Sequence, residues 1–198
     1  MAVLVEHDKR KHEILEKSLD LFIEEGYEDV TFQKIADRCG ITRTTLYIYF
    51  KNKREIFLWS IKQLTGSLEE QLMDIIKDES IKSTECLKLM FNKILDECES
   101  NSQLFKVLLV YLMQLTKSGV SPDERVNRRV IRMQHLMSTV VIRGQQKGEI
   151  KKDLSVKEIN NALYALTESA IFRLAVLGRK SLDDSREIIS FTVDRFAS

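Results

Sequence analysis

Strong helix breakers are rare in this chain, because its 198 residues include only one proline and seven glycines. Turn-rich β folds use both residue types often, so their scarcity favours long helices joined by short breaks. Apolar residues also recur at spacings of three and four between charged ones, as they do from Lys9 to Glu25. We therefore predict an all-α fold.

The breaks divide the predicted helices into two groups. Residues 1–52 are expected to form an N-terminal domain of three short helices, and residues 53–198 a larger helical domain. In the second domain we expect helices at about 53–77, 84–98, 104–115, 124–146, 156–177 and 183–196. Thr84 is a good helix N-cap for the second of these. The segment SGVSPDE, residues 118–124, is the clearest loop.

The stretch ITRTTLYIYFKNK, from Ile41 to Lys53, has the β-branched and aromatic composition of a strand. Its first residues indicate a helix instead. Thr42 is a good N-cap, and Ile41 before it can pack against Leu46 at the fourth helical position. The same arrangement occurs one helix earlier, where Thr31 follows an apolar residue. We predict a helix from Thr42 to Phe50 that buries Leu46 and Phe50.

Two short helices joined by a turn at Gly40, with a third helix before them, predict a helix-turn-helix. The second helix of such a pair lies in the DNA major groove and presents its N-terminal residues to base edges. Here those residues are Arg43, Thr44 and Thr45. Arginine can donate two hydrogen bonds to guanine, and threonine can contact a base edge or a thymine methyl group. Hydroxyl and ammonium groups suited to DNA phosphates are those of Thr31, Thr42, Tyr47, Tyr49, Lys51 and Lys53.

Charge supports DNA binding only locally. The net charge of the whole chain is +1, which gives no argument for a nucleic-acid or membrane partner. Between Gln33 and Arg54, however, six basic residues face one acidic residue, and Lys9, Arg10 and Lys11 add a basic start. The alternative is that both threonine-capped helices are packed bundle elements with a solvated basic face.

The segment VTFQKIADRCGITRTTLYIYFKNKREIF, residues 30–57, resembles the DNA-binding domain of the TetR family of transcriptional regulators. The resemblance extends from about Ile14 to Phe57, and KGEIKKDL is typical of the turn before the last two helices of that family. It implies a homodimer that binds a palindromic DNA operator, with one recognition helix per subunit and a small-molecule effector pocket in the C-terminal domain.

The resemblance also implies roles for single residues. The base-reading positions of the family fall on Gln33, Arg43, Thr44 and Thr45. Its phosphate contacts fall on Thr31, Thr42, Tyr47, Tyr49 and Lys53. Tyr49 stands where the family often has histidine; because it keeps a hydrogen-bonding tip, we still expect it to contact the DNA backbone.

The C-terminal domain carries two further predictions. A ligand pocket is expected among apolar and methionine side chains, although each of them also fits an ordinary core: Phe91, Leu95, Phe105, Leu109, Tyr111, Met113, Met133 and Met137. A four-helix dimer interface is expected from the last two helices: Leu163, Leu166, Ala170, Leu174, Ile188 and Phe191. One face of another helix gathers arginines that could attract an anionic effector, face acidic residues of a partner or, as is commoner for such a face, remain solvated: Arg125, Arg128, Arg129 and Arg132.

Other classes of protein find no support in the sequence. Three cysteines with no zinc spacing are interpreted as buried residues in a reducing compartment, a redox sensor being the alternative. The three histidines are scattered, and no phosphate-binding glycine loop or catalytic pattern occurs, so we expect no metal, no cofactor and no enzyme activity. Neither a signal peptide nor an apolar run of about 20 residues is present, which predicts a cytoplasmic protein without a membrane partner.

The sequence therefore predicts a DNA-binding transcriptional regulator, more often a repressor in the family it resembles, that an effector releases from its operator. Two alternatives stay open. One is a DNA-binding protein that responds to no ligand and has a solid C-terminal core. The other is a helical small-molecule-binding protein that does not bind DNA at all.

Overall fold

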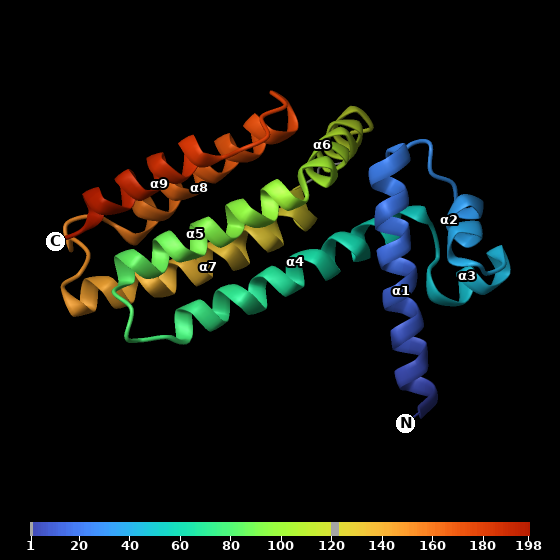
Figure 1. Ribbon diagram of the computed structural model, residues 1–198, viewed down its shortest axis with the longest axis horizontal. Helices are drawn as coiled ribbons and strands as arrows, with labels where there is room; N and C mark the ends of the chain where they lie inside the picture. The colour runs from blue at the N-terminus through green and yellow to red at the C-terminus, as the bar shows by residue number, and fades with distance from the viewer. Residues whose placement is uncertain (1, 120–122) are drawn as a thin grey trace. The chain divides into compact units, whose positions relative to one another are not determined.

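The computed structural model describes residues 2–119 and 123–198, with side chains at 6–119 and 131–198. Within these ranges the chain is helical and has no strand, apart from an isolated antiparallel bridge between Ile150 and Ala197. The predicted all-α fold is confirmed (Figure 1). The helices are α1 (Ala2–Glu25), α2 (Phe32–Cys39), α3 (Arg43–Tyr49), α4 (Lys53–Lys77), α5 (Ser83–Ser100), α6 (Ser102–Lys117), α7 (Asp123–Lys147), α8 (Val156–Ala175) and α9 (Asp183–Phe196).

The chain forms two compact units, unit 1 (Met1–Ser67) and unit 2 (Leu68–Ser198). Helix α4 contributes to both, because the division falls inside it. Our domain prediction puts the boundary at residues 52/53, where α4 begins; it concerns the division of function and stays a prediction. Among the described residues, no helix is long and apolar enough to cross a membrane.

Unit 1 is a small bundle in which α1 packs on α2 and α2 on α3. Apolar side chains of α1 to α4 meet in one core, where the rings of Phe22 and Phe57 lie edge to face with centroids 4.9 Å apart. The buried hydroxyl of Ser60 on α4 donates to the carbonyl oxygen of Leu15 on α1 at 2.9 Å. Helix α1 begins at Ala2 instead of the expected Lys9, because no glycine or proline interrupts the intervening residues.

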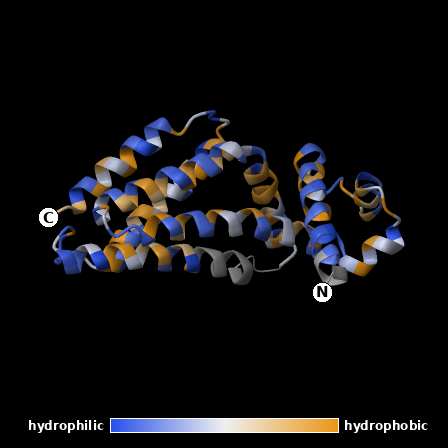
Figure 2. Ribbon diagram, turned by 60° about the horizontal axis from the view of Figure 1, so that its bottom comes forward, coloured by the Kyte–Doolittle hydropathy of each residue, from blue (hydrophilic) through white to orange (hydrophobic). Residues whose placement is uncertain are grey.

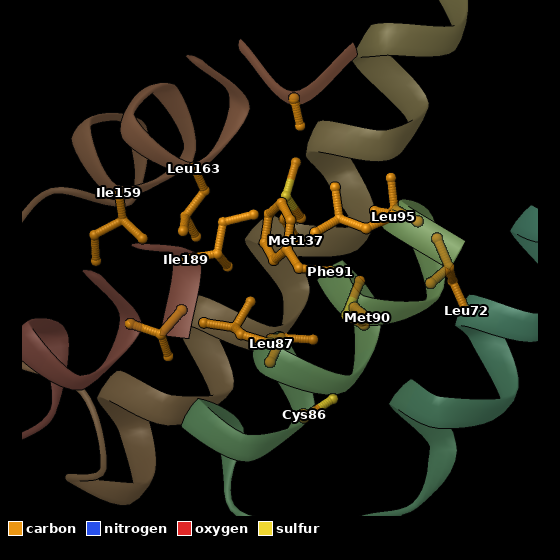
Figure 3. Packing of buried hydrophobic residues seen from close by; sticks show 14 of the residues in the cluster. Leu72, Cys86, Leu87, Met90, Phe91, Leu95, Met137, Ile159, Leu163 and Ile189 are labelled. Atoms are coloured by element: carbon orange, nitrogen blue, oxygen red, sulfur yellow. The ribbon is translucent and has the colours of Figure 1, made fainter. Parts of the chain in front are cut away.

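Unit 2 is built around α5, which packs against α7, α8 and α9. Figure 2 shows hydrophobic and hydrophilic residues alternating along most helices, as expected when each buries one face. In the core, Phe91 and Met137 lie close to Leu163 and Ile189 (Figure 3). Gly144 lets α7 approach its neighbours closely: a Cβ there would lie 2.6 Å from Cδ1 of Ile150.

The start of α5 differs from the prediction. The helix begins at Ser83 with Lys82 as its N-cap, so Thr84 lies inside the first turn and does not cap it. The cap contact comes from far along the chain, because the Glu149 carboxylate accepts a hydrogen bond from the Ser83 backbone N–H at 2.7 Å. In the expected SGVSPDE loop, α7 already includes the last two residues, and residues 120–122 lie outside the described part of the chain.

The three cysteines are free and buried, as predicted. Burial raises the pKa of the Cys98 thiol to about 12 and also raises those of Cys39 and Cys86. A thiol with a raised pKa is a poor nucleophile and a poor metal ligand at neutral pH. The alternative of a redox sensor therefore has no chemical support in this structure.

Candidate nucleic-acid interface

The start of helix α2, the start of helix α3 and the turn between them are each determined by residues close by in the sequence. The Thr31 hydroxyl accepts from the Lys34 backbone N–H at 3.2 Å and caps α2. The Thr42 hydroxyl accepts from the Thr45 backbone N–H at 3.1 Å and caps α3. Between the helices Gly40 has φ +66°, a left-handed conformation that glycine adopts without the strain other residues meet. The chain thus turns tightly and starts a second helix almost at once.

Helix α3 buries very little of its own surface. Leu46 is fully buried, and Phe50, which follows the helix as its C-cap residue, is 1% exposed. The opposite face carries polar and aromatic side chains, including exposed Arg43 and Thr44. The stretch that looks like a strand by composition is therefore a helix with its apolar side inward, as predicted.

Three of the predicted base-reading side chains lie near the start of α3, and one lies on α2. Arg43 and Thr44 are exposed, whereas Thr45 is half-buried and its hydroxyl lies 2.8 Å from that of Thr42. Gln33 is exposed on α2, where its amide nitrogen donates to the Asp37 carboxylate at 2.7 Å. The structure thus exposes Arg43 and Thr44 toward a base edge, whereas the Gln33 amide is held by a carboxylate of its own helix.

Lys53 does not point freely toward solvent. Its ammonium group donates to the backbone carbonyl oxygens of Tyr27 at 2.7 Å and Glu28 at 3.1 Å, and it lies 4.5 Å from the centroid of the Tyr27 ring. Burial lowers the pKa of this group. Lys51, by contrast, is exposed; its backbone N–H donates to the Glu55 carboxylate at 2.6 Å, and its ammonium group has no ion-pair partner among the described side chains. A phosphate contact suits Lys51 directly, whereas Lys53 would first have to leave the loop between α1 and α2.

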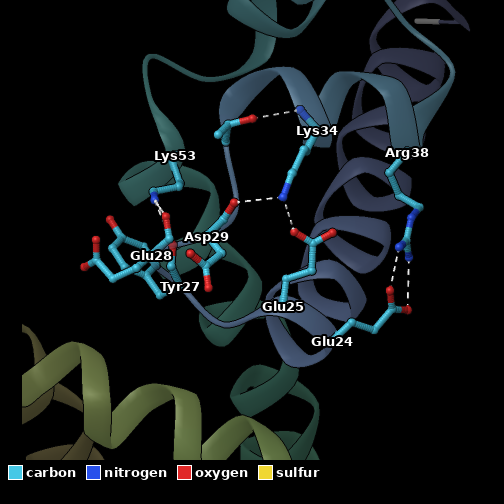
Figure 4. A network of polar contacts seen from close by, with 9 residues as sticks. Glu24, Glu25, Tyr27, Glu28, Asp29, Lys34, Arg38 and Lys53 are labelled. Carbon is cyan, nitrogen blue, oxygen red and sulfur yellow. Dashed lines mark hydrogen bonds and ion pairs between the residues drawn. The ribbon is translucent and has the colours of Figure 1, made fainter.

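The basic charge of this region is partly neutralised within unit 1. Lys34 forms an ion pair of 2.6 Å with Glu25, and Arg38 contacts both carboxylate oxygens of Glu24 at 2.5 and 3.1 Å (Figure 4). These hydrogen bonds lower the pKa of Glu24 and raise that of Arg38. In the described part of the chain, neither Arg43 nor Lys51 has an ion-pair partner. Positive charge available to DNA therefore lies on α3 and just after it.

Two features of this surface were not predicted. Ile48 is 69% exposed on α3, although it is a large apolar residue, and it follows Thr44 by one turn. Its position four residues after Thr44 could have identified it, since such residues share a helix face. The second feature is a contact of Tyr49, whose ring stacks on that of His7 in α1 with centroids 4.7 Å apart. Because 42 residues separate this pair in the sequence, no local pattern could have predicted it.

The predicted pocket residues of unit 2 do not share one environment. Phe91, Leu95 and Met137 belong to the buried core cluster, and Phe105 and Met133 pack against it. Among the others, Tyr111 is 3% exposed, Leu109 is half-buried and Met113 is 61% exposed. The first group matches the alternative of an ordinary core. A ligand pocket formed by these residues stays a prediction.

Part of the predicted dimer interface faces inward. Leu163, Ala170 and Leu174 are at most 1% exposed and belong to the core of unit 2, so they have no surface to offer a partner. Ile188 and Phe191 on α9 are 40% and 59% exposed, as an interface requires, and Leu166 is partly buried. The exposed apolar or small residues of α8 are Ala162, Ala165, Ser169 and Phe172, and the C-cap residue Val176 is exposed as well; the helix also exposes the polar residues Lys157, Glu158, Asn161 and Glu168. Of the arginine face on α7, only Arg132 has a described side chain; it contacts Glu69 at 3.3 Å, and Arg125, Arg128 and Arg129 lie outside the described side chains.

The geometry of α2 and α3 defines a DNA-binding protein of the helix-turn-helix class, and comparison with known proteins identifies the family. Residues 14–58 match the family described as "Bacterial regulatory proteins, tetR family". This segment is a DNA-binding domain of the TetR family of transcriptional regulators. The matched residues lie within unit 1 and contain α2, α3 and the turn between them.

Similarity to individual proteins extends over most of the chain. The fatty acid metabolism regulator protein of Bacillus subtilis is 24% identical over 159 residues, which cover 80% of each chain. The transcriptional repressor DhaR of a Mycobacterium species is 22% identical over 91% of this chain and 89% of its own.

Solved structures share the fold. A TetR regulator of Haloarcula marismortui is 19% identical and has a TM-score of 0.84 over 96% of this chain and 100% of its own. FadR of Bacillus subtilis, in complex with stearoyl-CoA, is 22% identical and has a TM-score of 0.76 over 94% of this chain and 97% of its own.

Proposed function

We propose that this regulator binds a palindromic operator as a homodimer, placing α3 of each subunit in the major groove, and leaves it when an effector binds unit 2. The observation that carries the proposal is the orientation of α3, which buries Leu46 and exposes Arg43 and Thr44. A dimer reads two half-sites one helical turn or more apart, so affinity depends on the spacing of the two recognition helices. Since the target is chromosomal DNA, we also propose a cytoplasmic location.

An exposed apolar strip on α8 and α9 supports the homodimer. The small exposed residues Ala162, Ala165 and Ser169 of α8 are followed by Phe172 and by the C-cap residue Val176, which are 52% and 55% exposed. Their spacings of three and four place them on one helix face. With Ile188 and Phe191 of α9, they offer a surface suited to the same two helices of a second copy. This set replaces the buried α8 residues of the predicted interface.

For the effector we propose a long-chain acyl-CoA. Solved FadR structures of related fold contain stearoyl-CoA in one case and lauroyl-CoA in another. The core of unit 2 is apolar and contains Met90 and Met137 beside Phe91, and methionines adapt readily to an inserted chain. Binding would release DNA only in so far as the acyl-CoA prefers the conformer whose recognition helices do not match the operator.

Selection of operators from random DNA, followed by fluorescence anisotropy, tests both parts. The wild-type dimer is expected to enrich a palindrome and to bind it in a salt-dependent manner. Oleoyl-CoA is then added, with free coenzyme A as the matched control that lacks the chain. Release by oleoyl-CoA alone would support the acyl-CoA effector. Palindrome binding that no acyl-CoA weakens would contradict the effector and leave the DNA function intact, whereas failure to enrich any sequence would contradict the regulator itself.

A further inference from the structure

Tyr47 is an exposed aromatic residue of the recognition helix that is nevertheless held in place. It lies on α3 and is 50% exposed, yet its ring packs against that of Phe32 in a tilted arrangement, with centroids 4.6 Å apart and an interplanar angle of 35°. Phe32 is the first residue of α2 and is half-buried. Aromatic pairs at this separation attract each other beyond the area they bury. One face of the Tyr47 ring is therefore fixed by the preceding helix.

Tyr47 also contacts Arg43, one helical turn earlier. Nη2 of Arg43 donates a hydrogen bond to the Tyr47 hydroxyl at 3.2 Å, and the guanidinium carbon lies 5.7 Å from the ring centroid. In the part of the chain with described side chains, Arg43 has no carboxylate partner. This contrasts with Arg38, which Glu24 holds through both oxygens. The orientation of the Arg43 guanidinium thus depends on a phenol.

A long arginine side chain has many rotamers, and ordering it on DNA costs affinity. The cost falls when the side chain is already held near its bound orientation. Direct reading of guanine requires two of the guanidinium N–H groups to meet two acceptors of the base at once, so it is sensitive to orientation. A contact that orients Arg43 would consequently change how well one base pair is distinguished from the others.

We propose that Tyr47 is a positioning residue for Arg43, with Phe32 as its support, and that discrimination at the base pair read by Arg43 depends on these contacts among the three residues. The inference rests on the proposed function, because it assumes that Arg43 reads a base. It differs from the role first predicted for Tyr47, a direct hydrogen bond to a phosphate. A phosphate contact carries no sequence information, so its loss weakens binding to all sequences equally.

The experiment uses the full chain and the operator enriched by the wild type, together with every operator that differs from it by one base pair. Anisotropy titrations give a discrimination ratio for each position. Arg43→Ala identifies the position that Arg43 reads, where the ratio is expected to fall about tenfold or more. Tyr47→Phe keeps the ring and its contact with Phe32 and removes only the hydroxyl that accepts from Arg43. It is expected to lower the ratio at the same position roughly threefold, and Phe32→Leu is expected to lower it there as well.

Tyr49→Phe is the matched control, because it removes a hydroxyl from the same helix at a ring that stacks on His7 and does not contact Arg43. It is expected to weaken binding to all operators by one common factor. Thermal unfolding followed by circular dichroism identifies variants that lose the fold.

The outcomes separate this inference from the function on which it rests. Unchanged ratios in Tyr47→Phe, beside a lost ratio in Arg43→Ala, would overturn the positioning role alone. Ratios unchanged in Arg43→Ala would overturn it too, since no base would then be read by Arg43. A wild-type protein that enriches no sequence would refute the proposed function, and the inference would fall with it.

Discussion

Helices α2 and α3 are neighbours of almost equal length, yet they are held in different ways. Helix α2 has eight residues and buries Ile35, Ala36 and Cys39. Its cationic side chains Lys34 and Arg38 also form ion pairs with glutamates of α1. Helix α3 has seven residues and buries only Leu46. One helix is thus bound to the bundle on several sides, and the other rests on a narrow apolar contact that leaves most of its surface for DNA.

The largest effect, on stability, is expected at Leu46, the buried residue of α3. Leu46→Ala should lower the free energy of unfolding by about 2–5 kcal/mol, because it removes a fully buried leucine and leaves a cavity. Ile48→Ala is the matched control on the same helix, and as a surface change at a residue 69% exposed it should cost less than about 0.5 kcal/mol. Urea unfolding measures both. Equal losses in the two variants would show that α3 is not held as described.

The next effect concerns DNA and separates the two arginines. Arg43→Ala should cost about 1–3 kcal/mol of discrimination at one base pair of each half-site, because the guanidinium is exposed and no carboxylate holds it among the described side chains. Arg38→Ala is the matched control: its guanidinium is occupied by Glu24, so discrimination should not change. Competition binding with single-base-pair operator variants measures both. A change at one position in Arg38→Ala would mean that α2 also reads bases.

A smaller effect distinguishes the two lysines that follow α3. Lys53→Met should lower the stability of unit 1 by about 1 kcal/mol, since two carbonyl oxygens lose a charged donor. Lys51→Met should leave stability unchanged and weaken binding to all sequences, with the slope of log K against log salt reduced by about 1. Urea unfolding and titrations at several salt concentrations provide the two measurements. If Lys53→Met reduces the salt slope as much as Lys51→Met does, Lys53 exchanges its carbonyl partners for a phosphate, as first predicted.

The same contrast explains what the sequence could predict. Helices α2 and α3 begin where Thr31 and Thr42 cap them, and a cap is determined by residues three positions apart. The hydrogen bonds of the Lys53 ammonium group could not be predicted in this way, because its partners Tyr27 and Glu28 lie 26 and 25 residues earlier in the sequence. The interaction depends on how α4 returns to the loop after α1, which no local pattern describes.

In α8 the difficulty was a different one. Apolar residues occur on both sides of that helix, so periodicity alone could not decide which side is core and which is exposed. Packing against α5 and α7 decides it, placing Leu163 and Leu174 inside and Phe172 outside. The sequence predicted that this segment is a helix and about where it begins and ends, but it did not predict which face of the helix is buried.

The smallest effect tests whether the pairs on α2 contribute to stability at all. Glu24 is solvent-exposed, and its hydrogen bond from Arg38 lowers its pKa from the ordinary value of 4.5. A carboxyl with a lowered folded pKa stabilises the fold above its unfolded pKa, and the contribution disappears as pH falls through the folded value. Glu24→Gln should therefore cause a slight loss of stability at pH 7, and the difference from wild type should shrink as pH falls below 4.5 and vanish once pH is below the lowered folded pKa. Salt should reduce it, as for other exposed ion pairs. Thermal unfolding of both proteins across this pH range, at low and high salt, measures the difference. A loss that persists in acid and in high salt would mean that Glu24 holds α2 through packing and that its charge contributes little.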